Sequence, residues 1–139
     1  MERSLVLIKP DAMQRRLAGT IISRLESQGI KLIAIKMLHM DKALAERHYA
    51  IHADKPFFKD LVNYITSTPI IAAVFEAEGA VEKIRGIMGA TEPAKAEPGT
   101  IRKDFGLDIQ QNSIHGSDSI ETSEKEIKLF FDEDEIFDY

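Results

Sequence analysis

The stretch Asn112–Asp118 places a histidine in a setting suited to nucleophilic chemistry. Imidazole is the one side chain whose ordinary pKa lets it act as a nucleophile or base near neutrality, so His115 is the candidate. Gly116 lets the backbone turn sharply beside the ring. Asp118 and Glu121 have the spacing of a capping box and predict a helix that begins directly afterwards. Helix N-termini favour anions, so we predict a nucleophile beside an anion-binding corner.

Two other histidine patterns suggest different chemistry, and their spacing argues against both. His48 and His52 at i, i+4 would place two imidazoles on one helix face as metal ligands. Tyr49 follows His48, so the HExxH pattern fails, and an exposed helix face is the simpler interpretation. Ser117 stands two residues after His115 and beside an aspartate, but a hydrolase triad takes its base and orienting carboxylate from separate segments. The chain also lacks GxxxxGK[ST] and GxGxxG, which excludes a P-loop and a dinucleotide-binding turn.

Cationic residues stand at the ends of apolar segments or within a long irregular region. These are Lys9, Arg85 and Arg102. A phosphoryl group in transfer needs cationic donors around its oxygens and at its leaving group. Arginine offers a planar fork for phosphate and lysine offers a point charge. Taken singly, each residue is equally consistent with a solvated surface charge.

The totals describe a single domain of ordinary composition. Of 139 residues, 44% are hydrophobic and 29% are charged, which excludes a disordered chain. A net charge of −5 argues against general nucleic-acid binding, although it permits binding of small polyanions. The longest apolar run, Pro69–Phe75, is too short to span a membrane. The segment from Met1 to Asp11 lacks the long apolar region and small-residue cleavage site expected of a signal peptide. With no cysteine, cytoplasm is the expected location.

Hydrophobic patterning predicts four strands with helices between them. The strands are expected at Ser4–Lys9, Ile30–Met40, Ile70–Phe75 and in a short segment leading to His115. The helices are expected from Thr20 to Gly29, Asp41 to Tyr49, Pro56 to Ile65 and Gly79 to Gly89, and after Asp118. Loops are expected from Pro10 through Arg15 and Arg16, and from Ala90 to Asp108, and a solvated acidic tail at Asp132–Glu135.

Six motifs occur in one fixed order along the chain. They are Lys9-Pro10-Asp11, His48-Tyr49, Lys55-Pro56-Phe57-Phe58, Gly89-Ala90-Thr91-Glu92-Pro93, Pro98-Gly99-Thr100-Ile101-Arg102 and Asn112-x-x-His115-Gly116-Ser117-Asp118. In this order they resemble the nucleoside diphosphate kinase family, and the likeness extends from Arg3 to about Phe131.

The resemblance implies a fold and a reaction. The fold is an α/β (α+β) sandwich, ferredoxin-like, in which residues 1–139 form one domain with helices packed on a four-stranded antiparallel sheet. The reaction is ping-pong transfer of the γ-phosphate of a nucleoside triphosphate to a nucleoside diphosphate. His115 resembles the phosphorylated nucleophile, and Glu126 and Ser117 resemble the groups that orient it or assist transfer.

The remaining matched positions imply a nucleotide site for ATP, GTP and other ribo- and deoxynucleotides. Those around the phosphates and sugar are Lys9, Tyr49, Arg102 and Asn112. Arg85 and Thr91 match the partners of the distal phosphates, and Phe57 matches the ring that stacks on the base. Stacking tolerates any base, because every base presents a π-face. Mg2+ is expected to arrive with the nucleotide and to be held mainly by its phosphates, with no protein metal ligand.

A few positions depart from the family pattern. Ala12 and Arg16 stand where many members have glycine, and so does Lys103 after Arg102; none matches a functional position. The chain stops at Tyr139, without the C-terminal segment that helps hold hexamers together in longer members. A homo-oligomer is therefore expected, a tetramer rather than a hexamer.

Two other functions fit the same fold and cationic site. A non-catalytic ferredoxin-like module could bind a nucleotide, regulate a partner and have no need of His115. A phosphocarrier would accept phosphate from a partner protein instead of a nucleotide. Labelling with γ-labelled ATP would distinguish all three functions.

Overall fold

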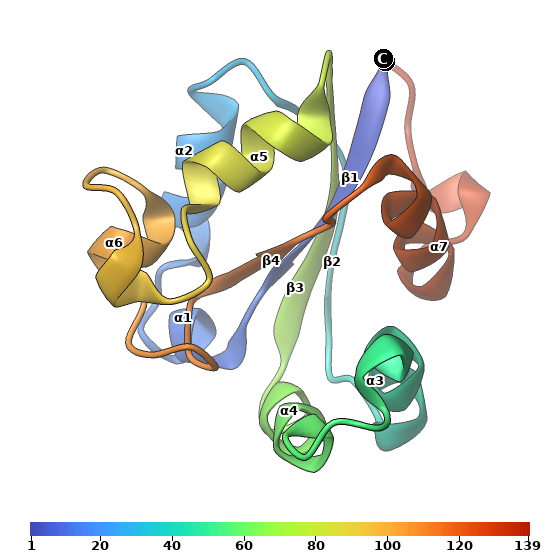
Figure 1. The fold of residues 1–139 in the computed structure, drawn as a ribbon. Helices are drawn as coiled ribbons and strands as arrows, with labels where there is room; N and C mark the ends of the chain where they lie inside the picture. The colour runs from blue at the N-terminus through green and yellow to red at the C-terminus, as the bar shows by residue number, and fades with distance from the viewer.

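The computed structural model describes residues 1–139 and is built around one antiparallel sheet. Its strands are β1 (Glu2–Ile8), β2 (Lys31–Leu38), β3 (Ile70–Ala77) and β4 (Ile114–Gly116). Their spatial order is β2-β3-β1-β4, so β4 forms one edge of the sheet (Figure 1). Both central strands are buried along most of their length, which explains their unbroken apolar sequences.

The helices cover both faces of this sheet. They are α1 (Pro10–Gln14), α2 (Ala18–Glu26), α3 (Lys42–His48), α4 (Phe58–Ile65), α5 (Ala80–Met88), α6 (Ile101–Phe105) and α7 (Ile120–Phe130). Three single 3₁₀ turns, η1 (Ala50–His52), η2 (Pro93–Lys95) and η3 (Glu133–Glu135), connect or follow them. Figure 1 shows α2, α5 and α6 on one side of the sheet and α3 and α7 on the other.

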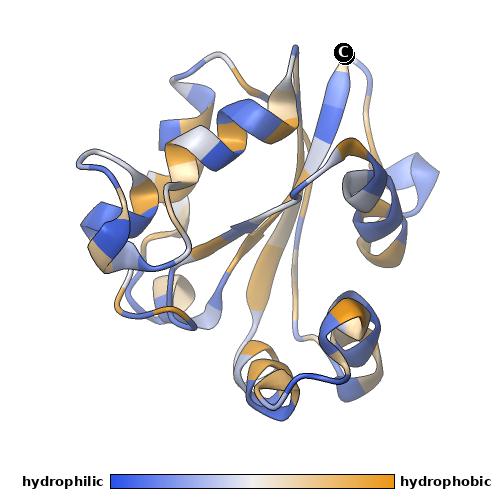
Figure 2. Ribbon diagram, viewed as in Figure 1, coloured by the Kyte–Doolittle hydropathy of each residue, from blue (hydrophilic) through white to orange (hydrophobic).

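Each face has its own hydrophobic core. Phe75 and Ile84 belong to the core beneath α2, α5 and α6, whereas Leu5 and Phe130 belong to the core beneath α3, α4 and α7. The helix ribbons in Figure 2 carry both hydrophobic and hydrophilic residues, as amphipathic helices packed on a sheet must. The predicted four-stranded antiparallel sandwich is therefore confirmed. None of the helices has the length and apolar character needed to cross a membrane.

Several predicted helix boundaries are wrong by one or two residues, and in α7 the reason is that a different side chain caps the helix. Ser119, not Asp118, is the N-cap of α7; its hydroxyl accepts from the Thr122 N–H, and Glu121 forms no capping box. α2 begins at Ala18, before Thr20. Pro56 precedes α4 instead of lying in its first turn. The cap at Asp41 and the glycines flanking α5 are confirmed.

Two predicted loops contain short helices, and the acidic tail is held in place. Pro10 begins the five-residue helix α1, and the region expected to be irregular from Ala90 to Asp108 contains η2 and α6. The acidic residues after Phe131 are mostly exposed, as expected, but they form η3, where Glu135 pairs with Lys36 at 3.3 Å. Helices this short lack the repeated apolar spacing that identifies longer ones.

Candidate active site

His115 lies in the middle of the edge strand β4, opposite Leu7 of β1. The short strand predicted to lead to His115 therefore contains it, and the helix predicted to follow begins at Ile120, after the turn at residues 117–119. Its neighbours in the strand face α5: Ile114 belongs to that core, and a Cβ on Gly116 would lie 2.5 Å from the Met88 sulfur. Because side chains alternate along a strand, His115 faces the opposite side, toward α7. Gly116 does not have a left-handed backbone, so glycine is not required there by its φ angle. It is required because a larger residue would collide with Met88.

Glu126 on α7 meets the His115 ring. The Nε2 atom of His115 lies 3.0 and 3.2 Å from the two carboxylate oxygens. Ser117 donates its hydroxyl to the same carboxylate at 2.6 Å and accepts from the Leu5 N–H. These contacts bring together the three residues expected to carry the reaction.

The protonation of this pair follows from its surroundings. Burial alone would raise the pKa of Glu126, but hydrogen bonding and charge from His115 and the Ser117 hydrogen bond together lower that pKa below its usual value. An ionised carboxylate can only accept hydrogen bonds, so Nε2 of His115 must carry the proton. In the neutral ring the lone pair then lies on Nδ1. The side chain is 26% exposed, so the ring remains partly open to solvent.

The Lys9-Pro10-Asp11 motif contacts the segment just before His115. Lys9 donates from Nζ to the Gln110 carbonyl at 2.6 Å and to Asn112 Oδ1 at 2.9 Å. Asp11 accepts from the Ser113 N–H at 3.3 Å and from its hydroxyl at 3.2 Å. Ser113 has a left-handed backbone, with φ of 77°. A non-glycine residue in that conformation persists only where its surroundings hold it, so the Asp11 contacts fix the approach to His115.

Lys9, Arg102 and Arg85 gather beside this segment. Burial, followed by the charge of Arg102, lowers the pKa of Lys9 to about 8. Burial, followed by the charge of Arg85, lowers the pKa of Arg102 to about 10. Arg102 donates to the Ile114 carbonyl at 2.8 Å and to the Gly89 carbonyl at 3.1 Å. The positive charges of Lys9, Arg102 and Arg85 are therefore close enough to repel one another, and together they favour the binding of a polyanion.

Asn112 links Lys9 to the loop that carries Thr91. Its amide nitrogen donates to the Thr91 carbonyl at 3.0 Å, while its oxygen accepts from Lys9. Thr91 itself is exposed beyond the C-terminus of α5, as is Arg85 on that helix. Thr91, which is predicted to meet the distal phosphates, therefore lies in a loop that Asn112 links to Lys9.

A series of aromatic rings leads from the surface to the nucleophile. The centroid separations are 5.5 Å from Phe57 to His52, 6.5 Å from His52 to Tyr49, 4.7 Å from Tyr49 to His48 and 4.8 Å from His48 to His115. Phe57 is 44% exposed, so its ring is available for stacking. Burial, followed by the charge of Glu126, raises the pKa of Tyr49 above its usual value, which keeps the phenol neutral.

His48 was not recognised as part of the site. The sequence predicts it on an exposed helix face with His52, but the His48 side chain is buried. Its nearest potential metal ligands are His115 and Glu126, not His52. Both His48 ring nitrogens lack a hydrogen-bond partner. Burial, followed by the charge of His115, lowers the pKa of His48 to about 3, so the ring is neutral. The signal for burial was its helical spacing from Leu44 and Ala45, which share the inward stripe of α3.

Asp11 and Ser113 were also missed, although both lie inside motifs that the sequence had singled out. Their roles depend on a contact across 102 residues, which periodicity cannot reveal. The remaining predicted site residues all fall in this region: His115, Glu126, Ser117, Lys9, Tyr49, Phe57, Arg85, Thr91, Arg102 and Asn112.

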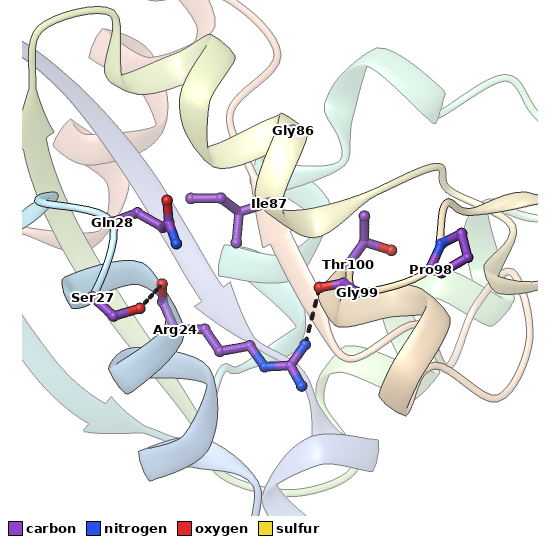
Figure 3. Close-up of a pocket in the computed structure, with 8 residues that line it drawn as sticks. All are labelled: Arg24, Ser27, Gln28, Gly86, Ile87, Pro98, Gly99 and Thr100. Atoms are coloured by element: carbon purple, nitrogen blue, oxygen red, sulfur yellow. Dashed lines mark hydrogen bonds between the residues drawn. The ribbon is translucent and has the colours of Figure 1, made fainter.

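Another hollow lies between α2, α5 and the loop before α6, with a volume of about 410 Å³ (Figure 3). Its eight lining residues include no histidine and no carboxylate. Arg24, its only cation, donates to the Gly99 carbonyl at 3.3 Å and pairs with Asp104 at 2.7 Å. This pocket therefore offers no nucleophile comparable with His115.

Comparisons with known proteins identify a family for this geometry. The model of the nucleoside diphosphate kinase family matches residues 2–136. A nucleoside diphosphate kinase from Dehalococcoides mccartyi strain 195 is 58% identical over 100% of this chain and 98% of its own length. One from Methanothermobacter thermautotrophicus is 56% identical over 100% of this chain and 93% of its own length.

Solved structures agree with these sequence matches. The Halobacterium salinarum nucleoside diphosphate kinase in complex with CDP has a TM-score of 0.97 and 49% identity, covering 99% of this chain and 92% of that one. The Aquifex aeolicus enzyme has a TM-score of 0.96 and 39% identity, covering 98% and 99%. Likeness of this extent, in sequence and backbone alike, makes the six ordered motifs more than a resemblance: the chain belongs to the nucleoside diphosphate kinase family of phosphotransferases, which transfer phosphate between nucleotides.

Proposed function

We propose that Nδ1 of His115 carries the phosphate between nucleotides. The observation behind this proposal is the ionised Glu126 carboxylate, which holds the ring proton on Nε2 and leaves the Nδ1 lone pair free. In the first step Nδ1 bonds to the γ-phosphorus of a nucleoside triphosphate, the bond to the β-phosphate oxygen breaks, and the diphosphate leaves with that electron pair. In the second step a β-phosphate oxygen of another diphosphate attacks the same phosphorus, and the N–P bond breaks.

Glu126 also stabilises the positive charge that develops on the ring. As Nδ1 bonds to phosphorus, the imidazole gains cationic character, and a carboxylate 3.0 Å from Nε2 offsets it. Ser117 holds the carboxylate in place by donating to its other oxygen. We assign Ser117 to positioning and Glu126 to charge stabilisation.

The cations and polar groups nearby would hold the phosphates. Lys9 has three N–H donors and uses two within the protein, which leaves one for a phosphate oxygen. Arg102 and Arg85 supply further positive charge, and Asn112 and Thr91 supply polar contacts. Tyr49, kept neutral by burial, can donate its O–H. Phe57 would stack on the base without selecting among ATP, GTP and other nucleotides.

Mg2+ is the divalent ion that we expect with the nucleotide. The one cluster of potential metal ligands near His115 contains two histidines, whereas Mg2+ prefers a shell of oxygen ligands. We therefore assign the ion to the nucleotide phosphates. Bound there, it would supply positive charge against the charge that builds up on the phosphoryl group during transfer.

We further propose that residues 1–139 form one cytoplasmic domain that assembles with copies of itself, as a tetramer rather than a hexamer. Assembly is supported by Ile35 and Met37 on the edge strand β2, which are 46% and 65% exposed. Exposed apolar side chains side by side on an unpaired sheet edge favour association.

The test is labelling with γ-labelled ATP and Mg2+. We expect the protein to acquire acid-labile, alkali-stable phosphate and to lose it when any nucleoside diphosphate is added. The His115→Ala variant should acquire no label and should lose transfer, whereas the control His39→Asn should behave as wild type. Near-normal turnover of His115→Ala would contradict the proposal. Absence of label in the wild type would favour the regulatory module, and label acquired only from a donor protein would favour the phosphocarrier.

A further inference from the structure

We propose that His48, His115 and Glu126 form a site for a divalent transition-metal ion such as Zn2+, and that an ion bound there blocks phosphorylation of His115. The binding part depends only on the geometry of these three residues. The inhibitory part rests on the proposed role of His115 as nucleophile. The two parts are therefore tested separately.

The three potential ligand atoms already lie close together. The Nε2 atom of His115 lies 3.0 Å from Glu126 Oε2, and Nδ1 of His48 lies 3.7 Å from the same oxygen. All three ligand atoms lie within 4.8 Å of one another. In a tetrahedral zinc site with bonds of about 2.1 Å, ligand atoms are separated by roughly 3.4 Å. Two of the present separations bracket that value, so small side-chain movements would complete the site.

His48 is the residue that points to a missing ligand. Its side chain is only 1% exposed, and neither ring nitrogen has a hydrogen-bond partner. The ring is enclosed by Tyr49, His115 and Phe130, with centroids 4.7 to 5.5 Å away. Buried polar atoms almost always have a partner, and each exception calls for an explanation. A metal ion on Nδ1 would supply the partner that the protein does not.

The donor set selects the kind of ion. Two imidazoles and one carboxylate suit Zn2+ and similar transition metals, whereas Mg2+ prefers an octahedral shell of oxygens. Metal binding to Nε2 of His115 needs the lone pair of that nitrogen: the Nε2–H bond breaks and the metal–nitrogen bond forms, while Nδ1 takes up a proton from solvent in place of the one released, so that the ring stays neutral. Because Mg2+ prefers oxygen ligands, magnesium held by nucleotide phosphates would not compete with zinc for His48 and His115.

An ion in this position would oppose the chemistry of His115. The metal would withdraw electron density from the ring and would engage the carboxylate that otherwise offsets the developing positive charge. With the ring proton on Nδ1, this nitrogen also has no free lone pair with which to attack phosphorus. Zinc occupancy should therefore slow the loading of phosphate onto the protein.

Binding is tested on the nucleotide-free protein. Titration with Co2+, a spectroscopic substitute for Zn2+, should give visible absorption bands of a tetrahedral nitrogen–oxygen site, and ZnCl2 should remove them. His48→Leu keeps a similar volume without a ligand and should lower metal affinity at least about tenfold. The control His39→Asn removes an exposed histidine and should bind as wild type. Equal affinity of wild type and His48→Leu would overturn the site.

A second measurement requires no variant. X-ray absorption at the zinc edge of the wild-type protein should report two imidazole nitrogens and at least one carboxylate oxygen. One imidazole or none would overturn the proposal, even if His48→Leu failed to fold.

Inhibition is tested by labelling with buffered free Zn2+ and excess magnesium ATP. The wild type and His39→Asn should acquire phosphate at least about tenfold more slowly with zinc, and His48→Leu should be nearly insensitive. Equal inhibition of all three would refute the inhibitory role. A wild type that acquires no label without zinc would refute the proposed function alone, since the cobalt spectrum is read without nucleotide.

Discussion

Glu126 shows how one side chain can determine the chemistry of another. Burial favours its neutral form, yet hydrogen bonds and charge from His115 and Ser117 outweigh burial and keep it ionised. The ionised form fixes which nitrogen of His115 carries the proton. The sequence identified both residues but could not choose the nitrogen, because that choice depends on which ring atom faces α7.

Phe57 provides a test of base stacking. Phe57 is 44% exposed, and its ring centroid lies 5.5 Å from that of His52, so Phe57→Ala removes little buried area. We expect nearly unchanged stability and a weaker nucleotide affinity, by roughly 5- to 150-fold, because stacking contributes about 1–3 kcal/mol per base. Calorimetric titration with several diphosphates measures the loss. A loss confined to one base would contradict a role in nonselective stacking.

Lys9 makes nucleotide binding dependent on pH. Because burial and Arg102 lower the pKa of Lys9 to about 8, the free protein holds this positive charge below pH 8 and loses it above. A phosphate prefers the charged form, so kcat/KM should fall above pH 8, by up to about tenfold per pH unit. The Lys9→Arg variant stays charged and should lack this decline. A wild-type profile that is flat from pH 8 to pH 10 would exclude Lys9 as a phosphate contact.

Among the elements, those with a long repeat and a distinct end were predictable. Helix α5 has a regular apolar stripe between Gly79 and Gly89, and both glycines have positive φ in the structure. α6 has only five residues, too few to display a helical period, so the sequence pattern predicts a loop there. The burial of His48 depends on how α3 packs against α7, which the pattern within α3 alone cannot show in full.

Packing between β4 and α5 explains why residue 116 is glycine. A Cβ there would lie 2.5 Å from the Met88 sulfur and 3.2 Å from the Ile84 methyl, both within a buried core. Gly116→Ala should therefore lower the free energy of unfolding by about 1–3 kcal/mol and displace His115. A Cβ on Gly86, also in α5, would have no atom within 4 Å. Gly86→Ala should therefore raise the free energy of unfolding by about 0.5–1 kcal/mol. Denaturant titrations compare the two; equal effects would refute the packing explanation.

At the scale of the whole molecule, the site collects residues from both helical layers at one edge of the sheet. Glu126 comes from α7 on one side, and Arg85 and Arg102 come from α5 and α6 on the other. They meet at β4 because it is an edge strand, with one side free of a neighbouring strand. The sequence predicts that these residues share one site only through the order of the six motifs, because no local pattern specifies which segments meet.

Assembly can be tested through the concentration dependence of stability. If Ile35 and Met37 on β2 are buried between copies, association stabilises the folded chain by mass action. A tenfold rise in protein concentration then contributes about 1.4 kcal/mol per interface formed, and Tm should rise by a few degrees. Met37→Lys places a charge in that interface and should remove the dependence. Ile120→Lys, at an exposed apolar position on α7, should retain the concentration dependence. A wild-type Tm that does not change with concentration, together with a monomeric sedimentation profile, would contradict assembly through this edge.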